Sequence, residues 1–226
     1  MTPKLHIKDN SLEAIKWIGL ALMVGDHVNK YLFSEKWHYL FNAGRAAMPL
    51  FVIVLAYNLA RPNTRSNGVY GRTMKRLLIV GIVATPAFIA LGGLLNGWWP
   101  LNIMMTLFVM TGILYLIERD GISSKIAAVF LLLIGGSSVE FWWPAILLGV
   151  AVWNYCKQPS FFWIIIGLAA IALLRLINGN YWAFAALPIV ALVSYIPFRM
   201  PRRKWLFYAF YPAHLILILA VSHIEI

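Results

Sequence analysis

Four places in the sequence carry ionisable side chains inside long apolar stretches, and their chemical types suit proton transfer and the stabilisation of negative charge. They are Lys16, the pair Asp26–His27, Arg45 and His214. A carboxylic acid beside a histidine is suited to general acid–base catalysis. A fixed arginine cation can stabilise a developing oxyanion or hold a carboxylate. Together these residue types predict an acyl-transfer or proton-transfer site.

The elements that carry these residues are predicted to be membrane-spanning helices. The chain has 226 residues, of which 62% are hydrophobic and only 12% are charged. An average soluble domain is about a quarter charged, so a soluble globule and a disordered chain are both excluded. A disulfide scaffold is excluded because Cys156 is the single cysteine. An ionisable residue within such a helix is costly and therefore marks a candidate functional site.

Nine apolar runs separated by turn-like residues predict an all-α polytopic membrane protein that forms one domain over residues 1–226. Each run is near the length of about 20 residues that crosses a bilayer as a helix. Two of the runs are short for a span, so eight passes are the alternative. The short runs are 123–139 and 142–156, and the others are about 10–33, 37–60, 75–95, 98–117, 160–177, 180–198 and 204–222.

The charge distribution predicts a cytoplasmic N-terminus. The net charge is +11, and most of the basic residues fall in loops on the N-terminal side of the predicted membrane. This bias follows the positive-inside rule, and it explains the basic charge without any nucleic-acid partner. The basic residues on that side are Lys4, Lys8, Lys16, Arg61, Arg65, Arg72, Lys75, Arg76, Arg119, Lys125, Lys157, Arg199, Arg202, Arg203 and Lys204.

The spacing of the ionisable residues places them at different depths. Asp26 lies about 22 Å along its helix from Ser11, in the outer half of the span, and Arg45 lies at a similar depth. Lys16 precedes His27 by close to three helical turns, so the two share a face about 16 Å apart. His214 lies about 15 Å into the last span, two residues after Pro212, which kinks a helix or frees carbonyl groups.

Each of these residues also has a purely structural interpretation, which the sequence leaves open. Asp26 and His27 could form a polar pair at the mouth of a helix, and Arg45 could simply neutralise Asp26. Lys16 could be an ordinary positive-inside anchor, and His214 could be packed in the core.

Further candidates come from the ends of the spans. Arg72, Lys75 and Arg76 begin the third span, where they could bind phosphates or merely follow the positive-inside rule. Glu140 and Asn102 could line a substrate cavity, and so could Tyr211, which neighbours His214. No ligand spacing supports a metal site, so we expect none.

The chain resembles the TraX family, whose members acetylate the N-terminus of F-type conjugative pilin. The resemblance extends from about residue 12 to 220. It is sharp in three stretches: Ala14–Trp17 with Leu22–Asn29, then Ala43–Phe51, then Phe210–Leu215. The family is in turn similar to the membrane acyltransferase-3 superfamily. That superfamily has a basic residue before the histidine of its first helix and further basic residues before its third. Lys16 and His27 match the first pattern, and Arg72, Lys75 and Arg76 match the second loosely.

The resemblance implies a multi-pass acetyltransferase of the bacterial inner membrane, with acetyl-coenzyme A (acetyl-CoA) as the donor and a pilin subunit as the protein substrate. Lys16, Arg72, Lys75 and Arg76 would bind the coenzyme phosphates. His27 would remove a proton from the acceptor amine with help from Asp26, or would carry the acetyl group covalently. Arg45 or His214 would stabilise the oxyanion, and Tyr211, Glu140 and Asn102 would contact the acceptor. The alternatives are an O-acyltransferase for a cell-envelope polysaccharide and a non-catalytic scaffold that binds pilin.

Overall fold

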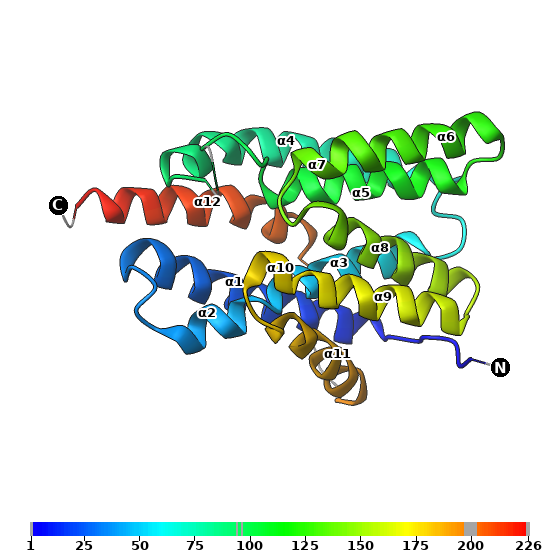
Figure 1. The fold of residues 1–226 in the computed structure, drawn as a ribbon, viewed down its shortest axis with the longest axis horizontal. Coiled ribbons are helices and arrows are strands. Elements are labelled where there is room, and N and C mark those ends of the chain that lie inside the picture. The colour runs from blue at the N-terminus through cyan, green and yellow to red at the C-terminus, as the bar shows by residue number, and fades with distance from the viewer. Residues whose placement is uncertain (1, 94, 96, 197–202, 225–226) are drawn as a thin grey trace.

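The protein is a bundle of helices in the computed structural model, which describes residues 2–93, 95, 97–196 and 203–224 (Figure 1). The helices are α1 (Asp9–Leu32), α2 (His38–Gly44), α3 (Ala47–Leu59), α4 (Val69–Ala90), α5 (Ile103–Glu118), α6 (Ile122–Phe130), η1 (Leu131–Gly135), α7 (Gly136–Ser138), α8 (Trp142–Lys157), α9 (Phe161–Leu173), α10 (Arg175–Asn178), η2 (Trp182–Ala185), α11 (Ala186–Tyr195) and α12 (Lys204–Ser222). Within these ranges β-structure is limited to one isolated bridge between Leu101 and Val139. The all-α prediction is therefore confirmed.

The surface of the bundle is apolar in the way that a bilayer requires. Large hydrophobic side chains on several helices point outward, for example Ile82, Phe130, Ile165 and Leu217. Such exposure would drive aggregation in water but suits contact with lipid chains. Four described helical stretches are long and apolar enough to cross a membrane, and three more apolar helices are shorter. The total of nine passes and the side of the N-terminus stay predictions.

Basic loops gather at one end of the bundle, at the right in Figure 1. We call this the basic end; it contains residues 2–8, 61–68, 119–121 and 158–160. The opposite end contains residues 33–37, 91–93 and 97–101 and the end of α12 near Ser222. Two residues assigned to the basic side by the sequence, Arg199 and Arg202, lie outside the described residues.

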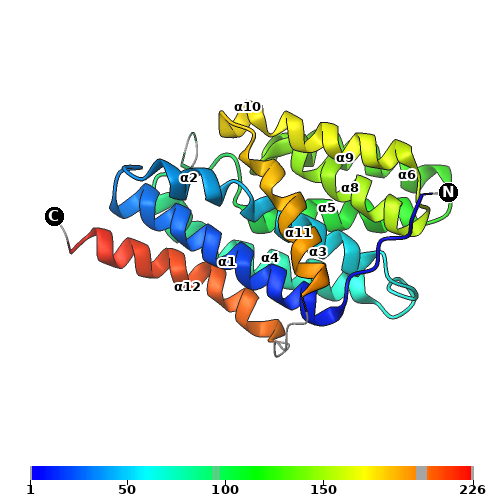
Figure 2. The same cartoon turned by 90° about the horizontal axis from the view of Figure 1, so that it is seen from below.

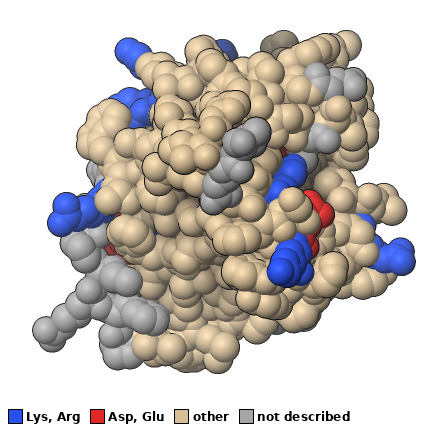
Figure 3. Space-filling model, turned by 90° about the vertical axis from the view of Figure 1, so that its left-hand side faces the viewer, with Lys and Arg blue, Asp and Glu red and all other residues tan. Residues whose placement is uncertain are grey.

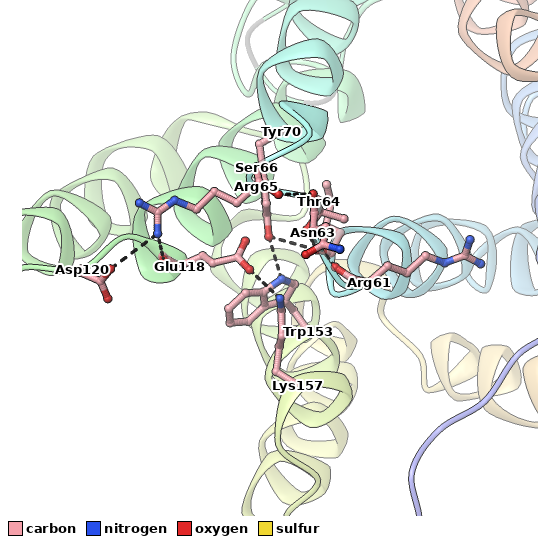
Figure 4. Close-up of polar contacts among 11 residues, drawn as sticks. Arg61, Asn63, Thr64, Arg65, Ser66, Tyr70, Glu118, Asp120, Trp153 and Lys157 are labelled. Atoms are coloured by element: carbon pink, nitrogen blue, oxygen red, sulfur yellow. Dashed lines mark hydrogen bonds and ion pairs between the residues drawn. The ribbon is translucent and has the colours of Figure 1, made fainter.

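A network of polar contacts fixes the basic end (Figure 4). The indole of Trp153 on α8 donates a hydrogen bond to the Tyr70 hydroxyl (2.9 Å), which donates to the Leu59 carbonyl (3.2 Å). Glu118 at the end of α5 pairs with Lys157 at the end of α8 (2.6 Å). These contacts join α8 to the end of α3, the start of α4 and the end of α5. The first turns of α4 are therefore held in place.

The second apolar run, expected as one span over 37–60, is the candidate span His38–Leu59, and it contains a local turn that the sequence did not indicate. Helix α2 ends at Gly44 and α3 begins at Ala47, with Arg45 in the turn between them. Pro49 explains the turn, because proline has no N–H to donate to the carbonyl four residues earlier, which here belongs to Arg45. The turn leaves Arg45 at a junction between helices.

The third span begins earlier than expected. The run was expected to begin at about residue 75, but α4 begins at Val69, directly after Gly68 in a left-handed conformation (φ 62°). Arg72 and Arg76 therefore stand on successive turns of one helix and project on one side of it. The sequence placed these cations at the correct end of the span, but it did not indicate this helical geometry.

The first and last helices are neighbours, although they stand at opposite ends of the chain. Figures 1 and 2 both show α12 beside α1, and the two helices are in contact. Helix α12 also packs against α4, whereas α1 packs against α2 and α3. The space between these helices contains the candidate site.

Candidate functional site

A cavity of about 640 Å³ follows α1 from the basic end toward the opposite end. Its lining begins at Asp9 and continues to Tyr31 and Glu35, so it extends about 30 Å along the helix. Helices α3, α4 and α12 supply most of the remaining wall. The middle is apolar and is lined by residues such as Leu20, Met23 and Leu55. Ionisable residues therefore collect at both ends of one cavity.

His27 lines the far part of this cavity and contacts His214 behind it. The Nδ1 atom of His27 lies 2.8 Å from the Nε2 atom of His214. Tyr31 packs edge-on against the His27 ring, with ring centroids 5.9 Å apart. His214 is buried and is absent from the cavity lining. The structure thus brings together two histidines separated by 187 residues, and only His27 faces the cavity.

Asp26 and Arg45 form an ion pair that also lines the cavity. The Nε atom of Arg45 donates a hydrogen bond to the Phe41 carbonyl (3.1 Å), and its guanidinium lies over the Phe41 ring at 4.2 Å. Both side chains of the pair are mostly buried. The predicted pairing at equal depth is confirmed, and the fixed guanidinium faces the cavity beside His27.

Gly44 is needed for the close approach of α2 to α1. A Cβ atom at Gly44 would lie 2.4 Å from Cβ of Asp26, which is far below any normal contact. We therefore expect Gly44→Ala to push Asp26 away from Arg45 and to lower the stability of the protein by about 1–3 kcal/mol. Gly25→Ala is the matched control, since its Cβ would meet nothing nearer than a Leu40 methyl at 3.5 Å. Thermal unfolding in detergent measures the difference, and equal melting temperatures for the two variants would contradict the prediction.

Other polar groups line the cavity toward the opposite end. Glu140 belongs to the link between α7 and α8, Lys30 belongs to α1, and Tyr211 comes from α12. Figure 3 faces this end of the molecule and shows few charged side chains, with the visible acidic atoms beside basic ones. Two of the three predicted acceptor residues, Glu140 and Tyr211, therefore lie on the cavity.

Asn102, the third predicted acceptor residue, is placed elsewhere. Its side chain accepts a hydrogen bond from the backbone N–H of Met104 (3.1 Å), as the N-cap of α5. Its amide donates to the Gly81 carbonyl (3.0 Å) and to the Thr85 hydroxyl (3.1 Å). Asn102 is fully buried and is not part of the cavity wall. The structure assigns it to joining α5 to α4.

Three of the four predicted coenzyme-binding cations line the cavity at the basic end. They are Lys16 from α1 and Arg72 and Arg76 from α4. The Arg76 guanidinium lies over the rings of Trp205 and Tyr208 on α12, at 5.0 Å and 5.9 Å. Lys75 differs, because its side chain is exposed and is absent from the cavity wall.

The sequence reasoning missed Glu13. Its Oε1 atom accepts a hydrogen bond from Lys16 (2.7 Å), whereas its buried Oε2 atom has no hydrogen-bond partner. Glu13 lines the cavity, so an N–H or O–H group of a bound molecule could satisfy this oxygen. The signal was present in the sequence, because Glu13 precedes Lys16 by three residues and such a pair meets on a helix face. Phe207, whose ring lies 4.4 Å from the Lys16 ammonium, was also missed.

The site offers a base, a fixed cation and a long cavity in one place. An imidazole with one unprotonated nitrogen can take a proton from an attacking nucleophile. A guanidinium held beside it can stabilise negative charge that develops on a carbonyl oxygen. Among the described residues, no group of three His, Cys, Asp or Glu side chains is arranged to hold a metal ion. The arrangement suits acyl transfer between two molecules that meet at His27.

Comparison with known proteins identifies the family. A family model described as TraX protein matches residues 11–222. A curated relative, Protein TraX of Escherichia coli, is 32% identical over 124 residues, which are 55% of this chain and 47% of the relative. This chain thus matches about half the length of that relative. No solved structure matches. Because the family model covers nearly all of the bundle described above, the chain belongs to the TraX family.

Proposed function

We propose that this protein is an inner-membrane acetyltransferase that moves an acetyl group from acetyl-CoA to the N-terminal amine of a conjugative pilin subunit. The observation that carries the proposal is one continuous cavity, which joins the cations Lys16, Arg72 and Arg76 at the basic end to His27 and Arg45 near the opposite end. Family membership supports a role in conjugation.

The basic end fits the anionic part of the donor. Lys16, Arg72 and Arg76 converge on the cavity there, and arginine suits bidentate contact with phosphate. The apolar middle of the cavity would accommodate the extended arm. The Oε2 atom of Glu13, one helical turn nearer the basic end than Lys16, offers an acceptor for an N–H or O–H group in the part of the coenzyme that carries the phosphates. Lys16 and His27 are about 16 Å apart along α1, so the thioester would lie near His27 while the phosphates stay at the basic end.

His27 and Arg45 can supply the proton transfers and the charge stabilisation that the acetyl transfer needs. His27 takes a proton as the acceptor nitrogen attacks the thioester carbonyl carbon, and Arg45 stabilises the oxyanion of the tetrahedral intermediate. Collapse of the intermediate breaks the carbon–sulfur bond. The proton on His27 then passes to the departing thiolate, so that the coenzyme leaves as its thiol and His27 returns to its neutral form. Glu140 and Tyr211, which line the cavity toward the opposite end, would contact the acceptor there.

Intact-mass spectrometry tests this function. The purified protein in liposomes is supplied with acetyl-CoA and a pilin subunit, and the expected product is pilin carrying one acetyl group at its N-terminus. Pilin with a chemically blocked N-terminal amine is the control and should stay unmodified. An unchanged pilin mass, with acetylation of an envelope polysaccharide instead, would support the O-acyltransferase. Pilin whose membrane level depends on the protein but whose mass does not change would support the scaffold.

The proposed donor site predicts different effects on the KM for acetyl-CoA when the adjacent cations Lys75 and Arg76 are replaced. Arg76→Gln is expected to raise the KM for acetyl-CoA about 10-fold or more, because it removes a charged contact with the phosphates. Lys75→Gln should leave that KM within about twofold, because the Lys75 side chain points away from the cavity. Initial rates at varied acetyl-CoA give both values. A larger effect at Lys75 than at Arg76 would overturn the placement of the donor.

A further inference from the structure

The contact between His27 and His214 lies in the planes of the two rings. The rings are parallel to within 9°, and their centroids are 5.1 Å apart, much farther than the 2.8 Å between the facing nitrogens. The two imidazoles therefore meet edge to edge, which is the geometry of a hydrogen bond between nitrogens. One nitrogen must donate and the other must accept.

A second contact decides which nitrogen donates. The Nδ1 atom of His214 lies 3.0 Å from the carbonyl oxygen of Phe210 on the preceding turn of α12. Because a carbonyl oxygen only accepts, Nδ1 of His214 must carry a proton. In neutral His214 the Nε2 atom then has the lone pair and accepts, so Nδ1 of His27 must donate to it. The remaining nitrogen of His27, Nε2, is left unprotonated.

The surroundings hold His214 in this orientation. The Phe210 ring lies parallel to the His214 ring to within 11°, and the Tyr211 ring meets it edge-on, each with centroids 5.4 Å apart. His214 is only 5% exposed and does not line the cavity. It therefore cannot reach a molecule in the cavity and can act there only through His27.

Asp26 does not take the orienting role, although it precedes His27 in the chain. Its carboxylate is paired with Arg45 on the α2–α3 junction. In many hydrolases a carboxylate fixes the tautomer of the catalytic histidine. Here a second histidine occupies the corresponding place.

We infer that His214 is a positioning residue, which fixes His27 with its proton on Nδ1 and its lone pair on Nε2, ready to accept a proton. This inference rests on the proposed function for its kinetic consequences, but the tautomer itself can be measured without any reaction. His214 therefore does not stabilise the oxyanion, as the sequence had suggested it could, but orients the base His27. When His27 gains a proton, its Nδ1–H continues to donate to His214, so the ring keeps its orientation through the reaction.

Two substitutions at one position provide the kinetic test. His214→Leu removes the acceptor for Nδ1 of His27 and should lower kcat about 10²-fold, with the KM for acetyl-CoA unchanged. His214→Gln places an amide oxygen near the former Nε2 position and should restore most of the lost kcat. His223→Leu, at an exposed position after α12, is the control and should behave as the wild type.

A double variant tests whether His214 affects kcat only through His27. In the background of His27→Ala, the further change His214→Leu should cost nothing more, because His214 acts only through His27. Independent effects that multiply would overturn the inference, and so would a raised KM or a failure of His214→Gln to recover activity. Melting temperature and size-exclusion profile show whether each variant is folded.

Nitrogen NMR of the protein labelled at histidine, in lipid bilayers, completes the test. The chain has five histidines, and the signals of His27 are assigned by their loss in His27→Ala. In the wild type, Nδ1 of His27 should be protonated and Nε2 unprotonated, whereas His214→Leu should give a mixture of tautomers. The opposite tautomer in the wild type would overturn the inference. A protein that shows the expected tautomer but acetylates nothing would instead refute the proposed function.

Discussion

Replacing His27 with alanine is expected to lower the rate of pilin acetylation by about 10²–10⁴-fold, the usual contribution of a general base. His27 is the imidazole on the cavity wall, and the tautomer inferred above leaves its Nε2 atom free to accept a proton. Loss of the ring leaves the Arg45 guanidinium and the bound substrates in place. The KM for acetyl-CoA should therefore change little while kcat falls.

Intact-mass spectrometry of pilin, taken at timed intervals, measures this loss. His38→Ala is the matched control, since His38 is exposed at the start of α2 and should have no effect. A second measurement separates the two possible roles of His27. Labelled acetyl-CoA supplied without an acceptor should leave label on the protein if His27 carries the acetyl group covalently, and none if it is only a base. An acetylation rate unchanged by His27→Ala would exclude both roles.

The second large effect concerns the ion pair of Asp26 and Arg45. Removing one partner leaves the other as an unpaired, mostly buried charge, which costs about 3–5 kcal/mol of stability. Asp26→Asn and Arg45→Gln are therefore each expected to lower the melting temperature strongly. Asp120→Asn is the control, because Asp120 is fully exposed opposite Arg65 and its loss should leave the melting temperature unchanged.

The double variant Asp26→Asn with Arg45→Gln tells a structural role from a catalytic one. Removal of both charges should recover most of the stability, because no unpaired charge remains. If Arg45 stabilises the oxyanion, kcat should stay about 10²–10³-fold below that of the wild type. Recovery of stability and kcat together would show that the pair is only structural. The comparison uses thermal unfolding and initial rates on the same preparations.

Much of the helical framework could be predicted because lipid imposes a simple rule on the sequence. Backbone polar groups must be satisfied within each span, so apolar runs between turn residues become helices. The run expected at 204–222 is α12, Lys204–Ser222, and the run expected at 142–156 is α8, Trp142–Lys157. The run expected at 37–60 is the candidate span His38–Leu59. Only the local turn at Arg45 within it was missed, although Pro49 has no N–H to donate at that place.

The sequence by itself determined which ionisable groups lie inside apolar helices, and their cost in a membrane marked them as candidates for a functional site. It also indicated that Asp26 and Arg45 would meet, because equal depth and opposite charge favour pairing. Only the tertiary structure decided the direction of each side chain. Lys75 and Arg76 are adjacent, yet one points outward and the other lines the cavity. Asn102 became a helix cap, and His27 met His214 across 187 residues. Such outcomes depend on the rotation of each helix about its axis and on the neighbours it packs against, which spacing along one chain does not contain.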